Sequence, residues 1–436
     1  MIVPSIDMQG GEVVQLVGGK ERALSAGEPG PIAERFGRVG EIAVIDLDAA
    51  LGTGRNADAI RELLPIARCR VGGGIRDARS AIGWLDAGAH RVILGTAATP
   101  DVLRELPRDR VIAALDARDG EVVTEGWTKA TGERVEDRIA ELREYVGGFL
   151  LTFVEREGRM AGLPMDRVAE LVRIAAPARV TVAGGVRTPA DVADADRTGA
   201  DAQVGMALYT GAFDLAAGFA APLVSDRGDG LWPTVACDQS GRTLGLAYSN
   251  LDSLRHAIET GRGAYHSRSR GGLWIKGETS GDTQELLSVE ADCDRDALRF
   301  TVRQAGGGFC HTGAATCFGD ASGLAALDRT LAARVADAPE GSYTARLLGD
   351  PSLLASKLRE ECGELVEAGT RGEAAHEAAD VIYFALVAAA ARGASLEDIE
   401  RELDRRALRV TRRPGDAKPA PGQPSEQPRP EEGDRA

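Results

Sequence analysis

Residues 1 to about 220 contain an internal repeat that leaves few folds open to this part of the chain. The sequence Val-Gly-Gly-Gly-Ile-Arg at residues 71–76 returns as Val-Ala-Gly-Gly-Val-Arg at residues 182–187, about 110 positions later. Two more pairs repeat at nearly the same spacing: residues 92–97 with 202–207, and Asp7 with Asp116. Because three near-equal offsets are not expected by chance, the repeat indicates two fused halves of one larger fold.

Eight short apolar runs, each followed by an amphipathic helical pattern, occupy the same region. They predict strands at residues 2–7, 42–47, 69–71, 91–94, 111–116, 149–153, 180–183 and 202–204. Strands that alternate with helices form parallel sheets, and eight such units favour a closed (β/α)8 TIM barrel over an open sheet. The sequence therefore predicts a multidomain chain that begins with a barrel over residues 1–222.

The pattern changes twice after the barrel. Residues 226–320 are strand-like and rich in turns, which predicts a small mainly-β or α+β domain. Helical periodicity returns over residues 323–412 and predicts an all-α domain. Residues 413–436 repeat Pro, Glu, Gln and Gly and hold too few apolar side chains to fold, so we expect a disordered tail.

The charge and the apolar runs restrict the partners of the chain. A formal net charge of −15 argues against a general nucleic-acid or anionic-membrane binder, although it leaves phosphorylated small molecules open. No apolar run approaches the 18 to 20 residues, roughly, of a membrane span. Met1 leads directly into a predicted strand rather than a signal peptide, so the cytoplasm is the expected location.

Two aspartates close predicted strands on opposite sides of the barrel. Asp7 and Asp116 end the first and fifth strands, and catalysis in such barrels takes place at the C-terminal ends of the strands. Two opposed carboxylates can serve as general acid and general base, and an alternative is that they only cap strand ends. Nearby turns offer backbone amides for two phosphates, one in each half: Gly73, Gly74, Gly95, Thr96, Gly184, Gly185, Gly205 and Met206.

Four short motifs relate the barrel to a known family. They are Ile6-Asp7, Asp-Leu-Asp-Ala-Ala at residues 46–50, Gly-Gly-Gly-Ile-Arg at residues 72–76 and Gly126-Trp127. With them, the barrel resembles the phosphoribosylformimino-aminoimidazole-carboxamide ribotide isomerases. The resemblance implies an Amadori-type conversion of an aminoaldose to an aminoketose, with Asp7 as the base and Asp116 as the acid.

The barrel also departs from that family. Gln15 stands where the family usually has Arg, and Glu157-Gly158-Arg159 replaces an Asp-Gly-Thr loop after the sixth strand. Pro164 replaces an expected Asn, whereas Thr152 is kept. These changes leave open an alternative in which the barrel is a non-catalytic scaffold, and they do not say whether it accepts a tryptophan-pathway analogue.

The middle domain carries a dense group of potential metal ligands. Thiolates suit zinc, so Cys293, Cys310 and Cys317 are the predicted zinc ligands, with an open position for a water molecule. The Asp-x-Asp-x-Asp spacing predicts three carboxylates on one side of a strand, which suits magnesium, and these are Asp292, Asp294 and Asp296. A purely structural zinc site is the alternative.

With three further motifs the same stretch resembles phosphoribosyl-AMP cyclohydrolase from about residue 230 to residue 319. The motifs are Leu-Ala-Tyr at 246–248, Ser-Arg-Ser-Arg at 267–270 and Trp-x-Lys-Gly-Glu-Thr-Ser-Gly at 274–281. The resemblance implies hydrolytic opening of a purine ring and a homodimer whose chains share the zinc ligands. It also implies that His311 moves protons and that phosphates contact Arg268, Arg270 and Lys276. Cys237 is expected to be a small buried residue.

Carboxylates at helical spacing mark the last domain, namely Glu360, Glu361, Glu364, Glu377 and Asp380. The second of the two predicted helices is apolar nearly all round, so its carboxylates would be costly to bury without a cation such as Mg²⁺. The pattern resembles the all-α nucleoside-triphosphate pyrophosphohydrolases, and specifically phosphoribosyl-ATP pyrophosphohydrolase, over about residues 323–410. Two alternatives are a solvated acidic face and a pyrophosphatase for damaged nucleotides.

The three resemblances correspond to steps two, three and four of L-histidine biosynthesis. Together they imply a multifunctional, ATP-binding hydrolase and isomerase that acts on phosphoribosyl nucleotides. Zn²⁺ and Mg²⁺ are the expected cofactors. A homodimer through the cyclohydrolase and helical domains is the expected assembly, and the sequence does not say whether intermediates are channelled.

Overall fold

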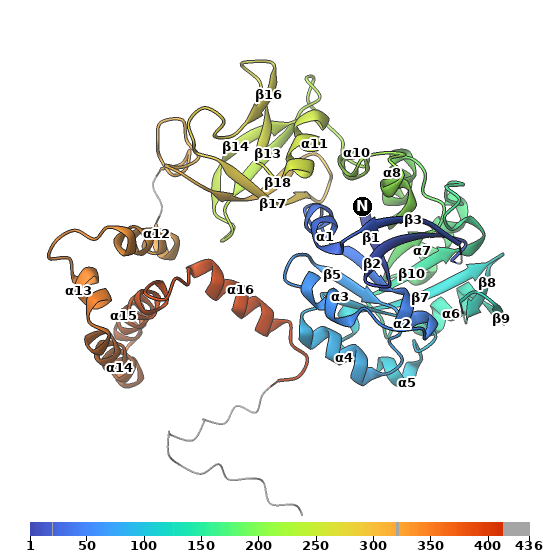
Figure 1. Cartoon of the computed structure of the whole chain (residues 1–436), viewed down its shortest axis with the longest axis horizontal. Coiled ribbons are helices and arrows are strands. Elements are labelled where there is room, and N and C mark those ends of the chain that lie inside the picture. The colour runs from blue at the N-terminus through green and yellow to red at the C-terminus, as the bar shows by residue number, and fades with distance from the viewer. Residues whose placement is uncertain (20, 125, 320–321, 413–436) are drawn as a thin grey trace, which may run out of the picture.

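A computed structural model describes residues 1–412 apart from positions 20, 125, 320 and 321 (Figure 1). The predicted disordered tail, residues 413–436, lies outside the described residues. The chain forms a barrel, then a small β-rich domain, then a group of helices. This order confirms the predicted fold class.

All eight predicted strands are present and pair in parallel around a closed ring. The first and last strands complete the closure, because Ile2 pairs with Ala202, and the two halves also meet where Ala114 pairs with Leu150. In ring order the strands are β1 (Ile2–Gln9), β4 (Ile42–Asp46), β5 (Cys69–Gly72), β6 (Arg91–Leu94), β7 (Val111–Arg118), β10 (Gly148–Phe153), β11 (Arg179–Ala183) and β12 (Ala200–Val204).

Helices surround the ring, and alternating side chains of the strands fill two separate layers. Inside the ring, Ile93, Ile112, Leu150 and Ala183 pack together. The side chains that point outward pack on the helices. Those helices are α1 (Pro29–Gly37), α2 (Leu47–Leu51), α3 (Ala57–Leu63), α4 (Ala78–Ala87), α5 (Pro100–Leu103), α6 (Val135–Leu142), α7 (Met165–Ala175), α8 (Pro189–Arg197), α9 (Met206–Tyr209) and α10 (Leu215–Ala220).

Each half of the barrel inserts an antiparallel hairpin that the sequence pattern did not predict. One follows the first strand and consists of β2 (Glu12–Val17) and β3 (Glu21–Gly27). The other follows the fifth strand and consists of β8 (Glu121–Thr124) and β9 (Lys129–Arg134). The two insertions stand at equivalent places in the repeat, which strengthens the half-barrel interpretation.

The second domain is a four-stranded sheet with one helix and a small separate hairpin. The sheet order is β14 (Thr243–Ser249), β13 (Trp232–Cys237), β18 (Leu298–Gln304) and β17 (Gln284–Ala291). The helix is α11 (Leu251–Thr260), and the hairpin pairs β15 (Ala264–Ser267) with β16 (Gly272–Ile275). Its buried side chains join the outer core of the barrel in one continuous cluster.

The last domain contains α12 (Gly323–Ala336), α13 (Tyr343–Gly349), α14 (Pro351–Glu367), α15 (Arg371–Ala390) and α16 (Leu396–Ala407). Its core is small and is centred on Leu347, Phe384 and Val387. Helix α15 was expected to be buried on nearly all sides, and that expectation is wrong for a single chain, because Ile382 is 40% exposed. None of the helices in the described part of the chain combines the length and apolarity needed to span a lipid bilayer.

Helix α16 leads the chain back to the other two domains (Figure 1). Glu397 accepts a hydrogen bond from Arg303 of the β-rich domain at 2.8 Å. Beyond the helix, the backbone N–H of Val410 donates to Asp86 of the barrel at 2.7 Å, and Arg110 donates to the carbonyl of Leu408. Helix α16 is thus attached to the other two domains near both of its ends.

Candidate active sites

A cavity of about 700 Å³ opens at the C-terminal ends of the barrel strands. Asp7 and Asp116 both line it. So do all eight predicted phosphate-binding positions, Gly73, Gly74, Gly95, Thr96, Gly184, Gly185, Gly205 and Met206. The structure therefore brings together every barrel residue that the sequence proposed for a site.

The two glycine pairs have the same backbone conformation in both halves. Gly73 has a φ of 94° and Gly184 a φ of 82°, in the region that side chains other than glycine rarely adopt. A Cβ on Gly73 would lie 2.2 Å from the carbonyl oxygen of Asp46, and one on Gly184 would lie 2.6 Å from that of Phe153. Only glycine fits at these positions, which keeps the backbone amides open to the cavity.

Burial changes the acidity of both aspartates. It raises the pKa of Asp7 to about 7, although a hydrogen bond from Gln15 at 3.4 Å acts in the opposite direction. Burial also raises the pKa of Asp116, against the effect of hydrogen bonds from Thr152 and Trp127. Asp7 can therefore hold or release a proton near neutral pH, and burial favours the protonated form of Asp116, as general acid–base catalysis requires.

Glu157 is a third carboxyl group in the same cavity, and the sequence analysis noted it only as a departure from the family loop. Burial, together with the negative charges of Asp7 and Asp116, raises its pKa to about 7. Its position after the sixth barrel strand, on the catalytic face, was the signal that could have identified it. Three carboxyl groups this close cannot all be ionised at low cost.

The two hairpins and the loop after β10 meet over this cavity. The backbone N–H of Gly18 donates to the carbonyl of Glu157 at 3.3 Å. A Cβ on Gly158 would lie 2.6 Å from the carbonyl oxygen of Leu16, so the loop and the first hairpin are in direct contact. The altered Glu157-Gly158 loop is therefore packed against the first hairpin.

The aspartate cluster of the β-rich domain lies in a turn, so the expectation that it lies along one side of a strand is wrong. The turn joins β17 to β18, and Arg295 at its apex has a φ of 69°. The carboxylate of Asp292 accepts hydrogen bonds from the backbone N–H groups of Asp296 and Ala297, at 3.0 and 3.2 Å. This curvature brings carboxylate oxygens of Asp292, Asp294 and Asp296 within 4.8 Å of one another.

The charges of this turn fit a hard divalent cation. The neighbouring Asp294 raises the pKa of Asp296, with smaller contributions from burial and Asp292. Oxygen ligands at this spacing are those that Mg²⁺ and Ca²⁺ prefer in proteins, and a cation would relieve the repulsion.

The three predicted zinc cysteines do not meet within one chain. Cys310 and Cys317 share a hydrogen bond, and the Thr312 hydroxyl 3.1 Å from the Cys310 sulfur lowers the pKa of Cys310. Cys293 is exposed in the aspartate turn. Of the described residues, two groups place three potential ligand atoms within 4.8 Å, and neither group contains a cysteine. Cys237 is only 4% exposed, as expected.

Two predicted phosphate-binding residues of this domain have different environments. Lys276 is buried, and its ammonium group donates to the carbonyls of Asp282 and Gly308 at 3.1 and 3.3 Å, so the expected phosphate contact finds no support here. Arg268 lies over the ring of Tyr248, with its guanidinium carbon 3.9 Å from the ring centre. His311 is exposed, and its Nδ1 lies 4.0 Å from the Cys310 sulfur.

Three of the five helical carboxylates converge between α14 and α15. Glu361, Glu377 and Asp380 have carboxylate oxygens within 4.8 Å of one another, and Glu361 is 6% exposed. Burial and the charges of Glu361 and Glu377 raise the pKa of Glu364, which lies beside the group. A buried carboxylate among like charges fits a bound cation.

Glu360 lies outside the converging group. The ammonium nitrogen of Lys357 lies 2.8 Å from carboxylate oxygens of both Glu360 and Glu361. These contacts raise the pKa of Lys357. They also place its positive charge at the edge of the three converging carboxylates.

Comparison with known families divides the chain in the same way. A family profile described as histidine biosynthesis protein matches residues 1–214. The profile of phosphoribosyl-AMP cyclohydrolase matches residues 245–319, and that of phosphoribosyl-ATP pyrophosphohydrolase matches residues 324–407. Both of the last two are families of metal-ion enzymes.

Individual relatives cover different shares of the chain. A histidine biosynthesis trifunctional protein of Komagataella pastoris is 51% identical over 49% of this chain and 25% of its own length. A histidine biosynthesis bifunctional protein of Schizosaccharomyces pombe is 50% identical over 45% of this chain and 47% of its own. The chain thus spans about a quarter of the length of the trifunctional relatives that it matches.

A relative from Halobacterium salinarum, named as an imidazole-4-carboxamide isomerase, is 42% identical over 49% of this chain and 94% of its own length. This relative is matched almost completely, and the three family profiles follow one another without overlap. The chain therefore belongs to the histidine biosynthesis protein family, with a phosphoribosyl-AMP cyclohydrolase domain and a phosphoribosyl-ATP pyrophosphohydrolase domain joined after the barrel.

Proposed function

We propose that the chain catalyses steps two to four of L-histidine biosynthesis in the reverse of their order along the sequence. The helical domain hydrolyses phosphoribosyl-ATP to phosphoribosyl-AMP and pyrophosphate, the β-rich domain opens the adenine ring, and the barrel isomerises the resulting aminoaldose. One observation carries the proposal furthest. Asp7 and Asp116 share one cavity with two glycine turns that both have positive φ, which suits a substrate with a phosphate at each end.

In the barrel, the backbone amides beside the glycine pairs bind the two phosphates and hold the sugar between the aspartates. Asp116, whose protonated form is favoured by burial, gives a proton to the ring oxygen as the furanose opens. Asp7 takes the proton from the adjacent carbon, so that the aldose becomes a ketose. The charge of Glu157 keeps one proton within this group of carboxyls at neutral pH.

In the β-rich domain, we assign zinc to Cys310, Cys317 and the Cys293 of a second chain, and magnesium to the aspartate turn. Zinc supplies a water molecule that is acidic near neutral pH. Burial and the neighbouring Cys310 raise the pKa of the Cys317 thiol, and the positive charge of buried Lys276 acts in the opposite direction. His311, beside Cys310, is placed to move the proton of the attacking water.

In the helical domain, Glu361, Glu377 and Asp380 are the proposed magnesium ligands. Magnesium held by these carboxylates would supply positive charge for binding and orienting the triphosphate. Lys357 lies at the edge of this group, where it can contact a phosphate oxygen.

We propose a homodimer through the cyclohydrolase and helical domains. Its main support is that Cys293 is separated from the other two cysteines within one chain. Apolar side chains on the helical domain also face outward, and Val366 is 86% exposed.

Thiolate ligands require a reducing compartment, which favours the cytoplasm.

The test is a one-pot reaction of the purified chain with phosphoribosyl-ATP, Mg²⁺ and Zn²⁺. Products are identified by mass spectrometry, and the two isomeric ribotides are separated by chromatography against standards. Accumulation of the ketose ribotide supports all three activities. A reaction that stops at the ring-opened aldose leaves a bifunctional enzyme with a scaffold barrel, and an Asp7→Asn variant with unchanged ketose formation removes the assigned isomerase site.

The substrate of the helical domain needs a separate test. Phosphoribosyl-ATP competes with ordinary and damaged nucleoside triphosphates, and the released pyrophosphate is measured for each. Preference for phosphoribosyl-ATP supports the biosynthetic assignment, whereas preference for another triphosphate indicates a pyrophosphatase that removes damaged nucleotides.

A further inference from the structure

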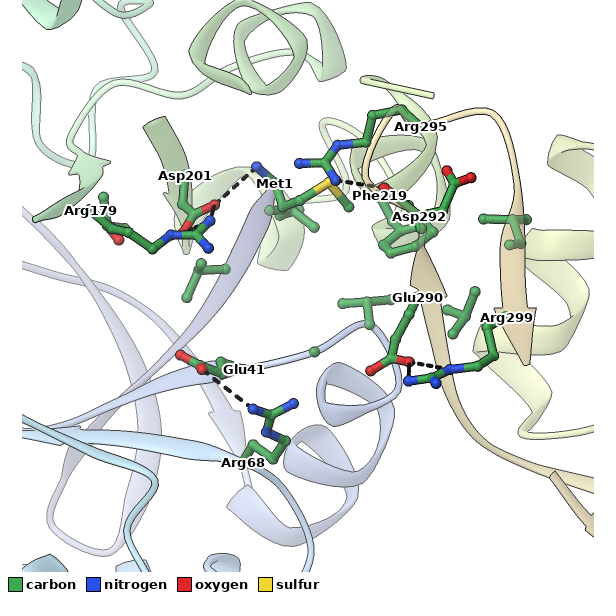
Figure 2. A pocket seen from close by; sticks show the side chains of 18 of the residues that line it. Met1, Glu41, Arg68, Arg179, Asp201, Phe219, Glu290, Asp292, Arg295 and Arg299 are labelled. Carbon is green, nitrogen blue, oxygen red and sulfur yellow. Dashed lines mark hydrogen bonds and ion pairs between the residues drawn. The ribbon is translucent and has the colours of Figure 1, made fainter. Parts of the chain in front are cut away.

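The aspartate turn of the β-rich domain is attached to the barrel through its central residue. Nη2 of Arg295 lies 3.0 Å from Oδ1 of Asp196, and Nε lies 3.3 Å from Oδ2. Asp196 belongs to α8 of the barrel. This two-point contact crosses between domains next to a cavity of about 940 Å³, which Arg295 and Asp292 help to line (Figure 2).

The side chain of Asp196 is held in place within the barrel. Its side chain is 15% exposed, and the amino group of Met1 lies 2.8 Å from its Oδ1. Burial alone would raise the pKa of Asp196, yet the hydrogen bonds of Arg295 and Met1 hold it below its usual range. The carboxylate is therefore ionised at neutral pH and keeps the Arg295 guanidinium at a defined place.

Arg295 is held by its backbone as well as by its side chain. Its carbonyl accepts a hydrogen bond from the backbone N–H of Val224, in the segment that connects the domains, at 2.9 Å. Its Nη1 donates to the carbonyl of Asp292 at 3.0 Å, as Figure 2 shows. The guanidinium thus contacts the first residue of the aspartate turn and the barrel at the same time.

The turn needs such support because repulsion between its own carboxylates opposes its conformation. Asp294 and Asp296 flank Arg295, and their carboxylates repel each other when no cation lies between them. The apex also adopts a left-handed backbone conformation at a residue other than glycine, which surrounding contacts must hold in place.

We infer that Asp196 is a positioning residue for the divalent-cation site of the aspartate turn, so that the barrel forms a structural part of the cyclohydrolase domain. The inference rests on the proposed binding of magnesium by Asp292, Asp294 and Asp296. It holds whether or not the barrel is itself catalytic. Partners that orient metal ligands without touching the metal typically change metal affinity by about 10- to 100-fold when they are removed.

The experiment measures Mn²⁺ binding by electron paramagnetic resonance in the full chain loaded with Zn²⁺. All proteins carry Glu377→Gln, which removes a ligand of the helical group, and Asp294→Asn identifies the signal that comes from the turn. The test variants are Asp196→Asn, Arg295→Gln and the two combined. The matched control is Asp194→Asn, on the same helix, where the carboxylate pairs with Arg197 at the surface.

We expect Asp196→Asn and Arg295→Gln each to weaken Mn²⁺ binding at the turn about tenfold or more. The double variant should bind no more weakly than the weaker single variant, because both changes remove one contact. Asp194→Asn should bind like the parent, and thermal unfolding checks that each variant is folded.

Two results would overturn different statements. If the turn binds Mn²⁺ in the parent but Asp196→Asn binds it equally well, the positioning role is wrong and the magnesium assignment stands. If Asp294→Asn and its parent bind Mn²⁺ equally, the turn is not a cation site, and the proposed magnesium assignment fails together with the inference.

Discussion

The indole ring of Trp127 packs directly on Gly19, where a Cβ would lie 2.5 Å from the ring carbon Cζ3. The contact joins the hairpin of the first half-barrel to that of the second. Trp127 also hydrogen-bonds the carboxyl group of Asp116. Trp127 therefore lines the cavity and is also a partner of the proposed general acid.

Replacement of Trp127 by Phe tests this double role. The variant Trp127→Phe cannot donate the hydrogen bond to Asp116. A hydrogen bond to a charged group contributes enough free energy that its loss should slow isomerisation about ten- to a hundredfold. Both hydrolytic rates should be unchanged, as measured by product chromatography. Trp84→Phe, on an outer helix where Arg61 covers the ring, is the control and should isomerise normally. Equal rates in the two variants would contradict the assigned role.

Glu157→Gln should change the pH dependence of isomerisation. Negative charge on Glu157 opposes ionisation of Asp7 and Asp116, so its removal lowers the pKa of both carboxyls. The base must be ionised to act. The acidic limb of the kcat/KM profile should therefore move to lower pH, by about half a unit or more. An unchanged limb, or one that moves to higher pH, shows that Glu157 does not interact with the reacting pair.

The glycine turns should tolerate no side chain. In Gly73→Ala the new Cβ meets the backbone of Asp46 at a positive φ, so the free energy of unfolding should fall by about 2 kcal/mol or more. Gly83→Ala is the control, because Gly83 lies within α4 with no atom within 4 Å of a new Cβ. That variant should be as stable as the parent or up to about 1 kcal/mol more stable. Urea unfolding of both variants distinguishes these outcomes.

Zinc content should depend on Cys310 and Cys317. Either Cys→Ser change removes a proposed ligand, so the metal measured by mass spectrometry of digested protein should fall from one zinc per chain to a small fraction. Cys362→Ser is the control, since Cys362 is exposed on α14 and lies outside both groups of converging potential ligands. Full zinc content in Cys310→Ser would show that the metal is held elsewhere.

Pyrophosphate release should depend on the converging helical carboxylates. Glu377→Gln leaves the proposed metal site with only Glu361 and Asp380 of its three converging carboxylates. We therefore expect the rate of the first hydrolysis to fall about a hundredfold or more. Glu367→Gln, at the exposed end of α14, should retain the parent rate. Added phosphoribosyl-AMP should restore the two later steps in Glu377→Gln, which separates a local defect from a folding defect.

Local periodicity was sufficient to predict the barrel strands and the two opposed aspartates. Each strand is a short apolar run of its own, and the repeated spacing predicts Asp7 opposite Asp116. The hairpin strand β9 was missed because Lys129 to Arg134 are polar and exposed, so no alternation of apolar side chains marks it. The glycine turns that are proposed to bind phosphate were predictable, because a turn with positive φ requires glycine at that position in the local sequence.

The environments of several site residues were decided only by the tertiary structure. The raised pKa of Glu157 depends on burial and on Asp7 and Asp116, which lie far from it in sequence but share one cavity. Cys293 has the residue type of a zinc ligand, yet the fold of one chain does not place it beside Cys310 and Cys317. The pairing of Asp196 with Arg295 spans two domains. Residue type and spacing therefore determined which groups are available for chemistry, whereas burial and the meeting of distant segments decided which of them act together.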